Sequence, residues 1–141
     1  MAKSTHGRKE QYDMSQVDKP NNDLIEKKVV QMQDDNTRFF TITAVSNTYT
    51  LDLSLAKNFC IETTNTIAKS IAFLNVPKTA NTIIQVSVLL TYTSVAAITH
   101  PTGTVWKDGT SPTFTAGMKY LILYTSYNNG ITWLASAVGA W

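Results

Sequence analysis

Charge is distributed very unevenly along the 141 residues, and this asymmetry limits which part of the chain can form a core. Residues 1–40 contain seven Lys/Arg and seven Asp/Glu, whereas the remaining residues contain only five and three. A mixed-charge segment that is poor in large apolar side chains cannot bury enough surface to fold alone. We therefore expect residues 1–37 to form an extended charged arm and residues 38–141 to form one folded domain.

The composition and periodicity of the second part predict strands. Residues 41–141 include 19 threonines, and most of the others are small, β-branched or aromatic, which is typical of sheets. In TIIQVSVLLTYT (residues 82–93), strict alternation places Ile84, Val86, Val88, Leu90 and Tyr92 on one face. The same period of two occurs in RFFTITA, NTYTLDLS and MKYLILYTSY, and each run predicts a strand with one buried face.

Short spacing between turn signals predicts the fold class. We expect an all-β fold over residues 38–137, an antiparallel β-sandwich of the jelly-roll kind with seven to nine strands and essentially no helix. Asp108-Gly109 predicts a tight turn, and the sequence from Asn128 to Gly130 predicts a hairpin, because glycine accepts the positive φ that such turns need.

The two C-terminal tryptophans are expected to differ in role. Across the predicted hairpin, Trp133 faces the strand that carries Tyr120, Ile122 and Tyr124, so we expect Trp133 in the core. Trp141 lies beyond Gly139. We expect it either to fold back over the sandwich or to meet another subunit, because a large apolar ring is seldom left in solvent.

Residues capable of catalysis or metal binding are few. Cys60 is the single cysteine, so no internal disulfide is possible. His6 and His100 have no sequence neighbours that suggest a metal cluster or a triad. A carboxylate pair between Asp52 and Glu62 stays open, because their distance in space is not given by the sequence. We expect no enzymatic activity, no metal and no cofactor.

Membrane and nucleic-acid partners are not expected either. No run approaches the roughly 18 apolar residues of a membrane span. The basic residues of KSTHGRKE are followed closely by Glu10 and Asp13, and the formal net charge is only +2. A segment that binds phosphates would carry a longer basic run without acids.

Four stretches carry a family resemblance: YTLDLSLAKNFCIETT, SIAFLNVP, TIIQVSVLLTY and the segment from ITHPTGTVW to the C-terminal ASAVGA. Together, over about residues 48–141, they resemble the small β-sandwich domain of bacteriophage structural proteins such as tail fibres, baseplate components and head-decoration proteins. The most specific block runs from Val105 and Trp106 through Gly109, Pro112 and Gly117 to Gly130 and Trp133. His100 stands where the family usually has its first tryptophan, and Lys107-Asp108 stands where Pro-Gly is common.

The resemblance implies a virion structural protein, a decoration or fibre-type protein whose arm is anchored to the capsid or the tail. It also implies a homotrimer, since related fibre and decoration proteins are often trimeric, and the expected partners are other copies of the chain and other virion proteins. The apolar residues expected to be gripped by a neighbouring surface are spaced along the arm: Tyr12, Met14, Val17, Leu24, Ile25, Val29, Val30 and Met32.

The alternative function is carbohydrate binding, as an adhesin or receptor-binding module at a fibre tip that contacts a host surface glycan. In that reading an exposed indole stacks on a sugar while loop residues bond its hydroxyls. The candidate glycan or protein contacts are Trp106, Lys107, Asp108, Asn128, Asn129 and Trp141.

Overall fold

The computed structural model describes residues 38–141. The predicted arm, with all of its docking residues, lies outside the described residues. The described part is all-β, as predicted: it contains no helix, and therefore none that could cross a membrane. Its nine strands are β1 (Phe40–Thr41), β2 (Thr48–Asp52), β3 (Asn58–Thr63), β4 (Lys69–Leu74), β5 (Ile84–Tyr92), β6 (Ile98–Thr99), β7 (Thr104–Trp106), β8 (Met118–Ser126) and β9 (Trp133–Val138).

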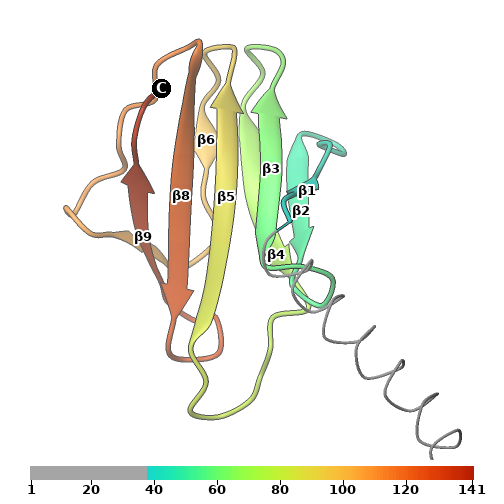
Figure 1. Cartoon of the computed structure of the whole chain (residues 1–141), viewed down its shortest axis with the longest axis vertical. Coiled ribbons are helices and arrows are strands. Elements are labelled where there is room, and N and C mark those ends of the chain that lie inside the picture. Colours follow the sequence, from blue (N-terminus) through green and yellow to red (C-terminus); the bar gives the residue numbers. More distant parts are fainter. Residues whose placement is uncertain (1–37) are drawn as a thin grey trace, which may run out of the picture. The chain divides into compact units, whose positions relative to one another are not determined.

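The strands form two sheets, with the larger in front of the smaller in Figure 1. The six-stranded sheet has the order β1-β3-β5-β8-β9-β7, and the three-stranded sheet has the order β2-β4-β6. The prediction of a purely antiparallel arrangement is wrong. Of the seven strand pairs in the described residues, five are parallel, and only β5–β8 and β8–β9 are antiparallel.

Four of the five parallel pairs, all except β7–β9, follow from how the chain moves between the sheets. From β1 to β6, each strand is followed by a strand of the other sheet. The nearest neighbour within one sheet is therefore two strands along, and it runs in the same direction. A parallel pair needs a crossover connection, and here the intervening strand of the opposite sheet supplies it.

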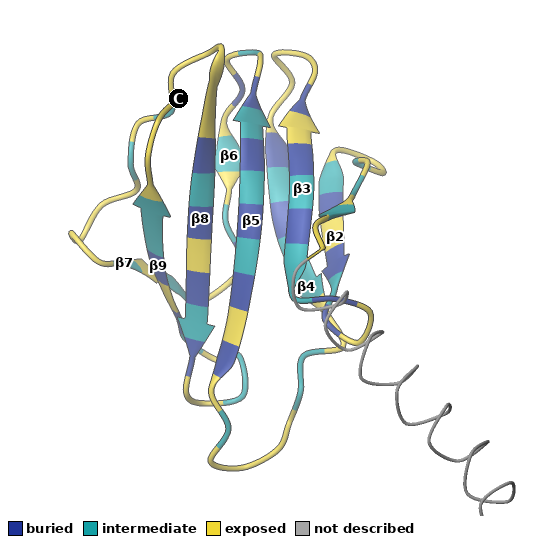
Figure 2. Ribbon diagram, viewed as in Figure 1, coloured by how far each residue is buried: buried dark blue, intermediate teal, exposed yellow. Residues whose placement is uncertain are grey.

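Both sheets contribute to one hydrophobic core. Tyr49, Leu51 and Ile71 come from the three-stranded sheet, and they share a cluster of buried residues with strands β3, β5, β8 and β9. Figure 2 shows the resulting bands along β3, β5 and β8, where buried residues alternate with more exposed ones. The predicted inward face of β5 is confirmed, since its residues from Ile84 to Tyr92 are buried at every second position.

Trp133 is a core residue, as predicted, with 2% of its surface exposed. Its ring packs against Phe73 of β4 at a centroid distance of 4.5 Å, and Phe73 also packs edge-on against Tyr124 of β8. The hairpin predicted at Asn128–Gly130 joins β8 to β9 in antiparallel register, and Asn129 and Gly130 both have positive φ.

Trp141 continues the pairing with β8, but in a shifted register. Leu121 pairs with Val138, so an unbroken ladder would place Ala140 opposite Lys119. Instead, the backbone N–H of Lys119 donates to the carbonyl of Trp141 at 2.9 Å. One extra residue is accommodated at Gly139, whose φ is +71°, as in a β-bulge that uses a left-handed glycine.

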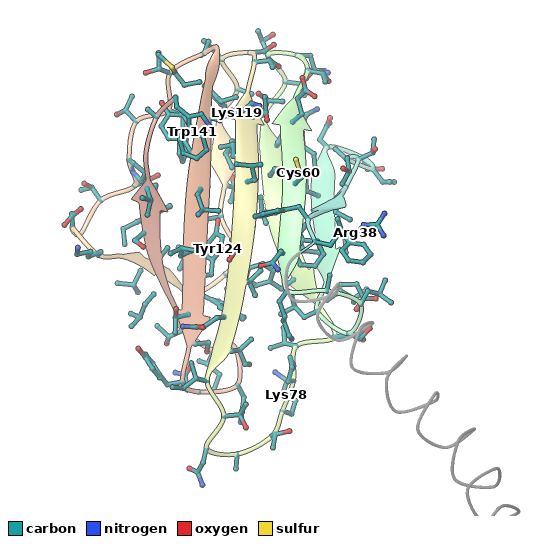
Figure 3. All side chains as sticks on the ribbon, in the orientation of Figure 1. Arg38, Cys60, Lys78, Lys119, Tyr124 and Trp141 are labelled. Atoms are coloured by element: carbon teal, nitrogen blue, oxygen red, sulfur yellow. The ribbon has the colours of Figure 1, made fainter. Side chains whose placement is uncertain are left out.

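This shift exchanges faces, because side chains alternate sides along a strand. In regular register Trp141 would share the inward side of Trp133 and Ala135; beyond the extra residue it points outward, with 59% of its surface exposed. Figure 3 places its ring beside Lys119 at one end of β8.

Candidate functional site

Trp106 belongs to an aromatic cluster rather than to an open surface. It lies on β7, where its backbone pairs with Ala135 of β9, and its side chain is half-buried. The imidazole of His100 packs edge-on against the indole at a centroid distance of 4.7 Å. Phe114 and Tyr124 also lie against His100. One side of the Trp106 ring is therefore already in contact with protein.

His100 is a strongly perturbed titratable group of this cluster. Its Nδ1 shares a hydrogen bond of 2.8 Å with the Tyr124 hydroxyl, whereas Nε2 is buried without a hydrogen-bond partner in the described residues. Burial among aromatic rings disfavours the imidazolium and lowers the pKa of His100 from 6.5 to about 4. Burial also raises the pKa of Tyr124. Both groups are therefore neutral at pH 7.

We expect His100 to make the domain less stable as the pH falls from 6.5 to 4. The folded-state pKa is depressed, so in this window the unfolded chain binds the proton and the folded chain does not. Because the ring is only partly buried, the free energy of unfolding should drop by on the order of 1–2 kcal/mol. Urea unfolding at pH 7 and pH 4.5 measures this drop, and His100→Gln should abolish that part of it. An equal drop in the variant would show that other groups cause the pH dependence.

Lys107 and Asp108 lie in the turn after β7 and are exposed. The predicted turn is confirmed, since the Gly109 N–H donates to the Trp106 carbonyl at 3.0 Å and Gly109 has a φ of +80°. The two charged side chains therefore lie next to Trp106 in the fold as well as in the sequence.

Asn128 and Asn129 serve the β8–β9 connection. The Asn128 Oδ1 accepts from the backbone N–H of Thr132 at 2.9 Å, and its Nδ2 donates to the Thr132 hydroxyl at 3.2 Å. The carbonyl of Asn129 accepts from Lys78 Nζ at 2.9 Å. These bonds hold the turn itself, so the Asn128 amide is already used on both sides.

The six candidate contact residues do not form one site. Asn128 follows the end of β8 at Ser126, whereas Trp141 pairs with Lys119 near the start of the same strand. Ser126 lies seven positions after Lys119, which corresponds to about 24 Å along a strand. Trp106, Lys107 and Asp108 stay together as consecutive residues after β7, and Asn128 and Asn129 stay together in the β8–β9 connection.

The acidic residues and the cysteine have separate surroundings. Asp52 Oδ1 accepts from the Ser54 backbone N–H at 2.9 Å and from Asn75 Nδ2 at 3.0 Å. A bond from the Ser54 hydroxyl, followed by the bond from Asn75, lowers the pKa of Asp52. Glu62 lies instead beside Tyr49. Tyr49 is three residues before Asp52 on β2, which places the two backbone positions about 10 Å apart. Cys60 is a free, half-buried thiol.

No group of three or more His, Cys, Asp or Glu side chains within residues 38–141 could hold a metal ion.

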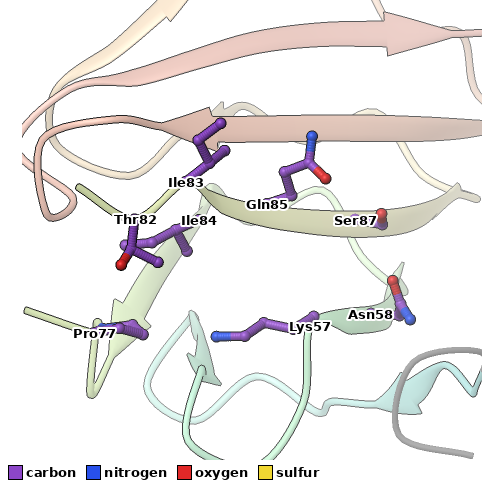
Figure 4. Close-up of a pocket in the computed structure, with 8 residues that line it drawn as sticks. All are labelled: Lys57, Asn58, Pro77, Thr82, Ile83, Ile84, Gln85 and Ser87. Carbon is purple, nitrogen blue, oxygen red and sulfur yellow. The ribbon is translucent and has the colours of Figure 1, made fainter. Parts of the chain in front are cut away.

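The described surface has pockets, one of which opens between the start of β5 and Lys57 (Figure 4). It has a volume of about 440 Å³ and lies between Lys57 and residues that include Pro77 and Ile83. The ammonium of Lys57 donates to the Leu53 carbonyl at 3.1 Å, and burial lowers the pKa of Lys57.

A feature that the sequence analysis did not identify is the outer face of the six-stranded sheet, the face that points away from the core. Cross-strand pairs align Val138 with Leu121, Leu121 with Leu89, and Leu89 with Cys60. We call the apolar residues gathered here the outer apolar face: Leu89, Val105, Leu121, Leu123, Leu134, Val138 and Trp141.

The outer apolar face is partly open to solvent. The exposed fractions include 50% for Val105, 44% for Leu134 and 51% for Val138. Alternation within the strand places Leu121 and Leu123 on the side opposite Tyr120 and Ile122, but it gives no sign that neighbouring strands add apolar residues on the same side.

Comparisons of the chain with protein-family models, with curated proteins and with solved structures find no match.

Proposed function

We propose that the chain is a structural protein of a bacteriophage particle, a decoration or fibre-type protein located in the virion. In this proposal, residues 38–141 form a jelly-roll-like β-sandwich that is displayed on the particle, and residues 1–37 dock it to the capsid or the tail. The packing of two sheets around one core supports the sandwich. The sequence resemblance described above supports the phage assignment.

The outer apolar face carries the assembly part of the proposal. Contiguous exposed apolar surface is uncommon on monomeric proteins and usually marks an interaction surface. Here it extends over four adjacent strands, β5, β8, β9 and β7. Two charged residues of the described strands lie on this face, Lys119 and Glu62. Both pair with Thr91, so they form one cross-strand row. This row lies next to the row that contains Leu121 and Val138, toward the border of the face. An apolar centre with charges toward its border is the composition of a subunit interface.

We expect the full-length chain to be a homotrimer at micromolar concentration, with a sedimentation mass three times that of the 15.6 kDa chain. Leu123→Glu should shift it toward monomer and weaken association at least tenfold, because a buried carboxylate without a partner opposes assembly. Sedimentation equilibrium measures both. A wild-type chain that stays monomeric at this concentration would contradict the proposal.

A matched control tests whether the effect of the introduced carboxylate depends on its position in the outer apolar face. Leu55 is also an exposed leucine, with 65% of its surface accessible, but it lies in the turn after β2, away from the outer apolar face. Leu55→Glu should leave the trimer intact. Circular dichroism of both variants would show that each remains folded.

Glycan binding through the Trp106 region is the second candidate, and the geometry supports it less. Sugar stacking needs an accessible indole face, and Trp106 is half-buried against His100. The Asn128 amide is used within its turn. Lys107 and Asp108 remain available at the turn, but they lie beside a ring that is largely occupied.

A further inference from the structure

Lys69 is a buried cation with a neutral partner. It begins β4 and points toward the inside of the three-stranded sheet, on the same side as Ile71, with 7% of its surface exposed. Its Nζ donates to Asn47 Oδ1 at 2.9 Å, and no carboxylate forms an ion pair with it in residues 38–141. Burying an ammonium is costly unless an anion compensates it, and an amide oxygen supplies only part of that compensation.

The partner of Lys69 is held in place by a tight turn. Ser46 and Asn47 both have positive φ, 50° and 64°, and Val45 and Thr48 exchange two backbone hydrogen bonds of 2.9 Å across them. The Asn47 carbonyl also accepts from the Ser70 N–H at 3.0 Å. Left-handed residues other than glycine are costly and are often found at binding sites. Here they fix the amide of Asn47 beside the ammonium.

Lys69 lines a pocket of about 590 Å³. The pocket lies at the open side of the domain, where β1 is the edge of the larger sheet and β2 is the edge of the smaller one. Several of its lining residues carry hydroxyl or amide groups: Thr41, Thr43, Ser46, Asn47, Thr64 and Asn65.

Two of the amides are oriented by bonds within the protein. Asn65 Oδ1 accepts from the backbone N–H of Ile67 at 3.1 Å, and Asn47 Oδ1 accepts from Lys69. With the oxygens engaged in this way, the NH₂ group of each side chain is left to donate to another acceptor. The pocket therefore offers one cation and at least two neutral donors.

Glu62 limits the charge of a ligand. It lines the same pocket. Burial of Tyr49 raises the pKa of Tyr49, and the negative charge of Glu62 raises it further. Tyr49 also lines the pocket, and its hydroxyl donates to the Glu62 carbonyl at 2.6 Å. One ammonium opposed by one carboxylate favours a monoanion over a dianion such as phosphate.

We propose that this pocket binds a small hydroxylated monocarboxylate, of the chemical class of a uronic acid, with the carboxylate on Lys69 and hydroxyls on Asn47 and Asn65. A carboxylate would form a charge-assisted hydrogen bond with the ammonium. The proposal is independent of the assignment to a virion, because it depends on this pocket alone.

The test is an NMR titration of the full-length chain at pH 7 with glucuronate. Glucuronate should shift the side-chain amide signals of Asn47 and Asn65 and bind in the millimolar range or more tightly. Methyl glucoside, which has the hydroxyls without the charge, and acetate, which has the charge without the hydroxyls, should each bind at least tenfold more weakly. The proposal is overturned if glucuronate shifts neither amide, if either fragment binds equally well, or if phosphate binds more tightly.

Variants test the role of each charge. Lys69→Met should weaken glucuronate binding at least tenfold, and Lys69→Arg, which keeps the charge, should retain part of it. Glu62→Gln should tighten binding severalfold, because it removes the opposing carboxylate. Lys78→Met removes one positive charge at an exposed site in the β4–β5 connection, where the ammonium donates to the Asn129 carbonyl, and should change nothing. If Lys69→Met does not fold, the Glu62→Gln result decides: unchanged or weaker binding would overturn the proposal.

Discussion

Trp133→Ala is expected to destabilise the domain by about 3–5 kcal/mol, the range for removing a large aromatic side chain from a core. Trp133 has 2% of its surface exposed, and its contact with Phe73 joins β9 of the larger sheet to β4 of the smaller one. The substitution therefore removes packing between the sheets as well as apolar area. Urea unfolding followed by circular dichroism at pH 7 measures the change.

Trp141→Ala is the matched control, because it removes the same side chain from an exposed position. In the single chain the Trp141 ring contacts Gly139 and has 59% of its surface exposed, so at a protein concentration low enough to keep the chain monomeric we expect a change of less than about 1 kcal/mol. Equal losses in the two variants would mean that Trp133 is not the inter-sheet contact described here.

Side-chain faces could be predicted from the sequence, whereas strand pairing could not. The alternation in β5 and β8 depends only on the period of two within each strand, so the buried positions from Ile84 to Tyr92 and from Tyr120 to Tyr124 agree with it. Turn residues show that the chain reverses, but not which sheet receives the next strand. The parallel pairing of β3 with β5, which are separated by β4 of the other sheet, therefore left no local signal.

The candidate site was less predictable, because register decides which residues meet. The extra residue at Gly139 changes the face on which Trp141 lies, and a count along the strand does not reveal it. Lys69 did leave a trace. It is two residues before Ile71 in the run AKSIAF, so alternation places both on the same, inward face of a strand. A lysine at an inward position is unusual enough to indicate a partner or a ligand.

Under the proposed function, deletion of residues 1–35 should leave the domain folded but prevent incorporation of the protein into phage particles. The described hydrophobic core consists of residues between Tyr49 and Ala135, with partly buried neighbours from Phe40 to Ala137, and the deletion retains all of them. We expect the free energy of unfolding to change by less than about 1 kcal/mol. The arm has apolar side chains spaced between charges. Fixing the backbone of any segment costs roughly 1–2 kcal/mol per residue, so in the proposed function docking needs a partner surface that compensates.

Salt provides an independent check on docking. Lys3, Arg8, Lys9, Lys27 and Lys28 are distributed along the arm, and contacts between charges at a surface weaken as ionic strength rises. Release of the full-length chain from particles should therefore increase with salt concentration. The circular dichroism of the released protein should stay unchanged.

Incorporation into particles is the most direct test of the assignment to a virion. Full-length chain and the chain lacking residues 1–35 would be supplied separately during phage assembly, and each would be quantified by mass spectrometry in gradient-purified particles. The account predicts that the full-length protein is present at a fixed copy number and that the truncated protein is absent although folded. Recovery of the truncated protein at full occupancy would show that the β domain is the anchor, and absence of the full-length protein would contradict the assignment to a virion altogether.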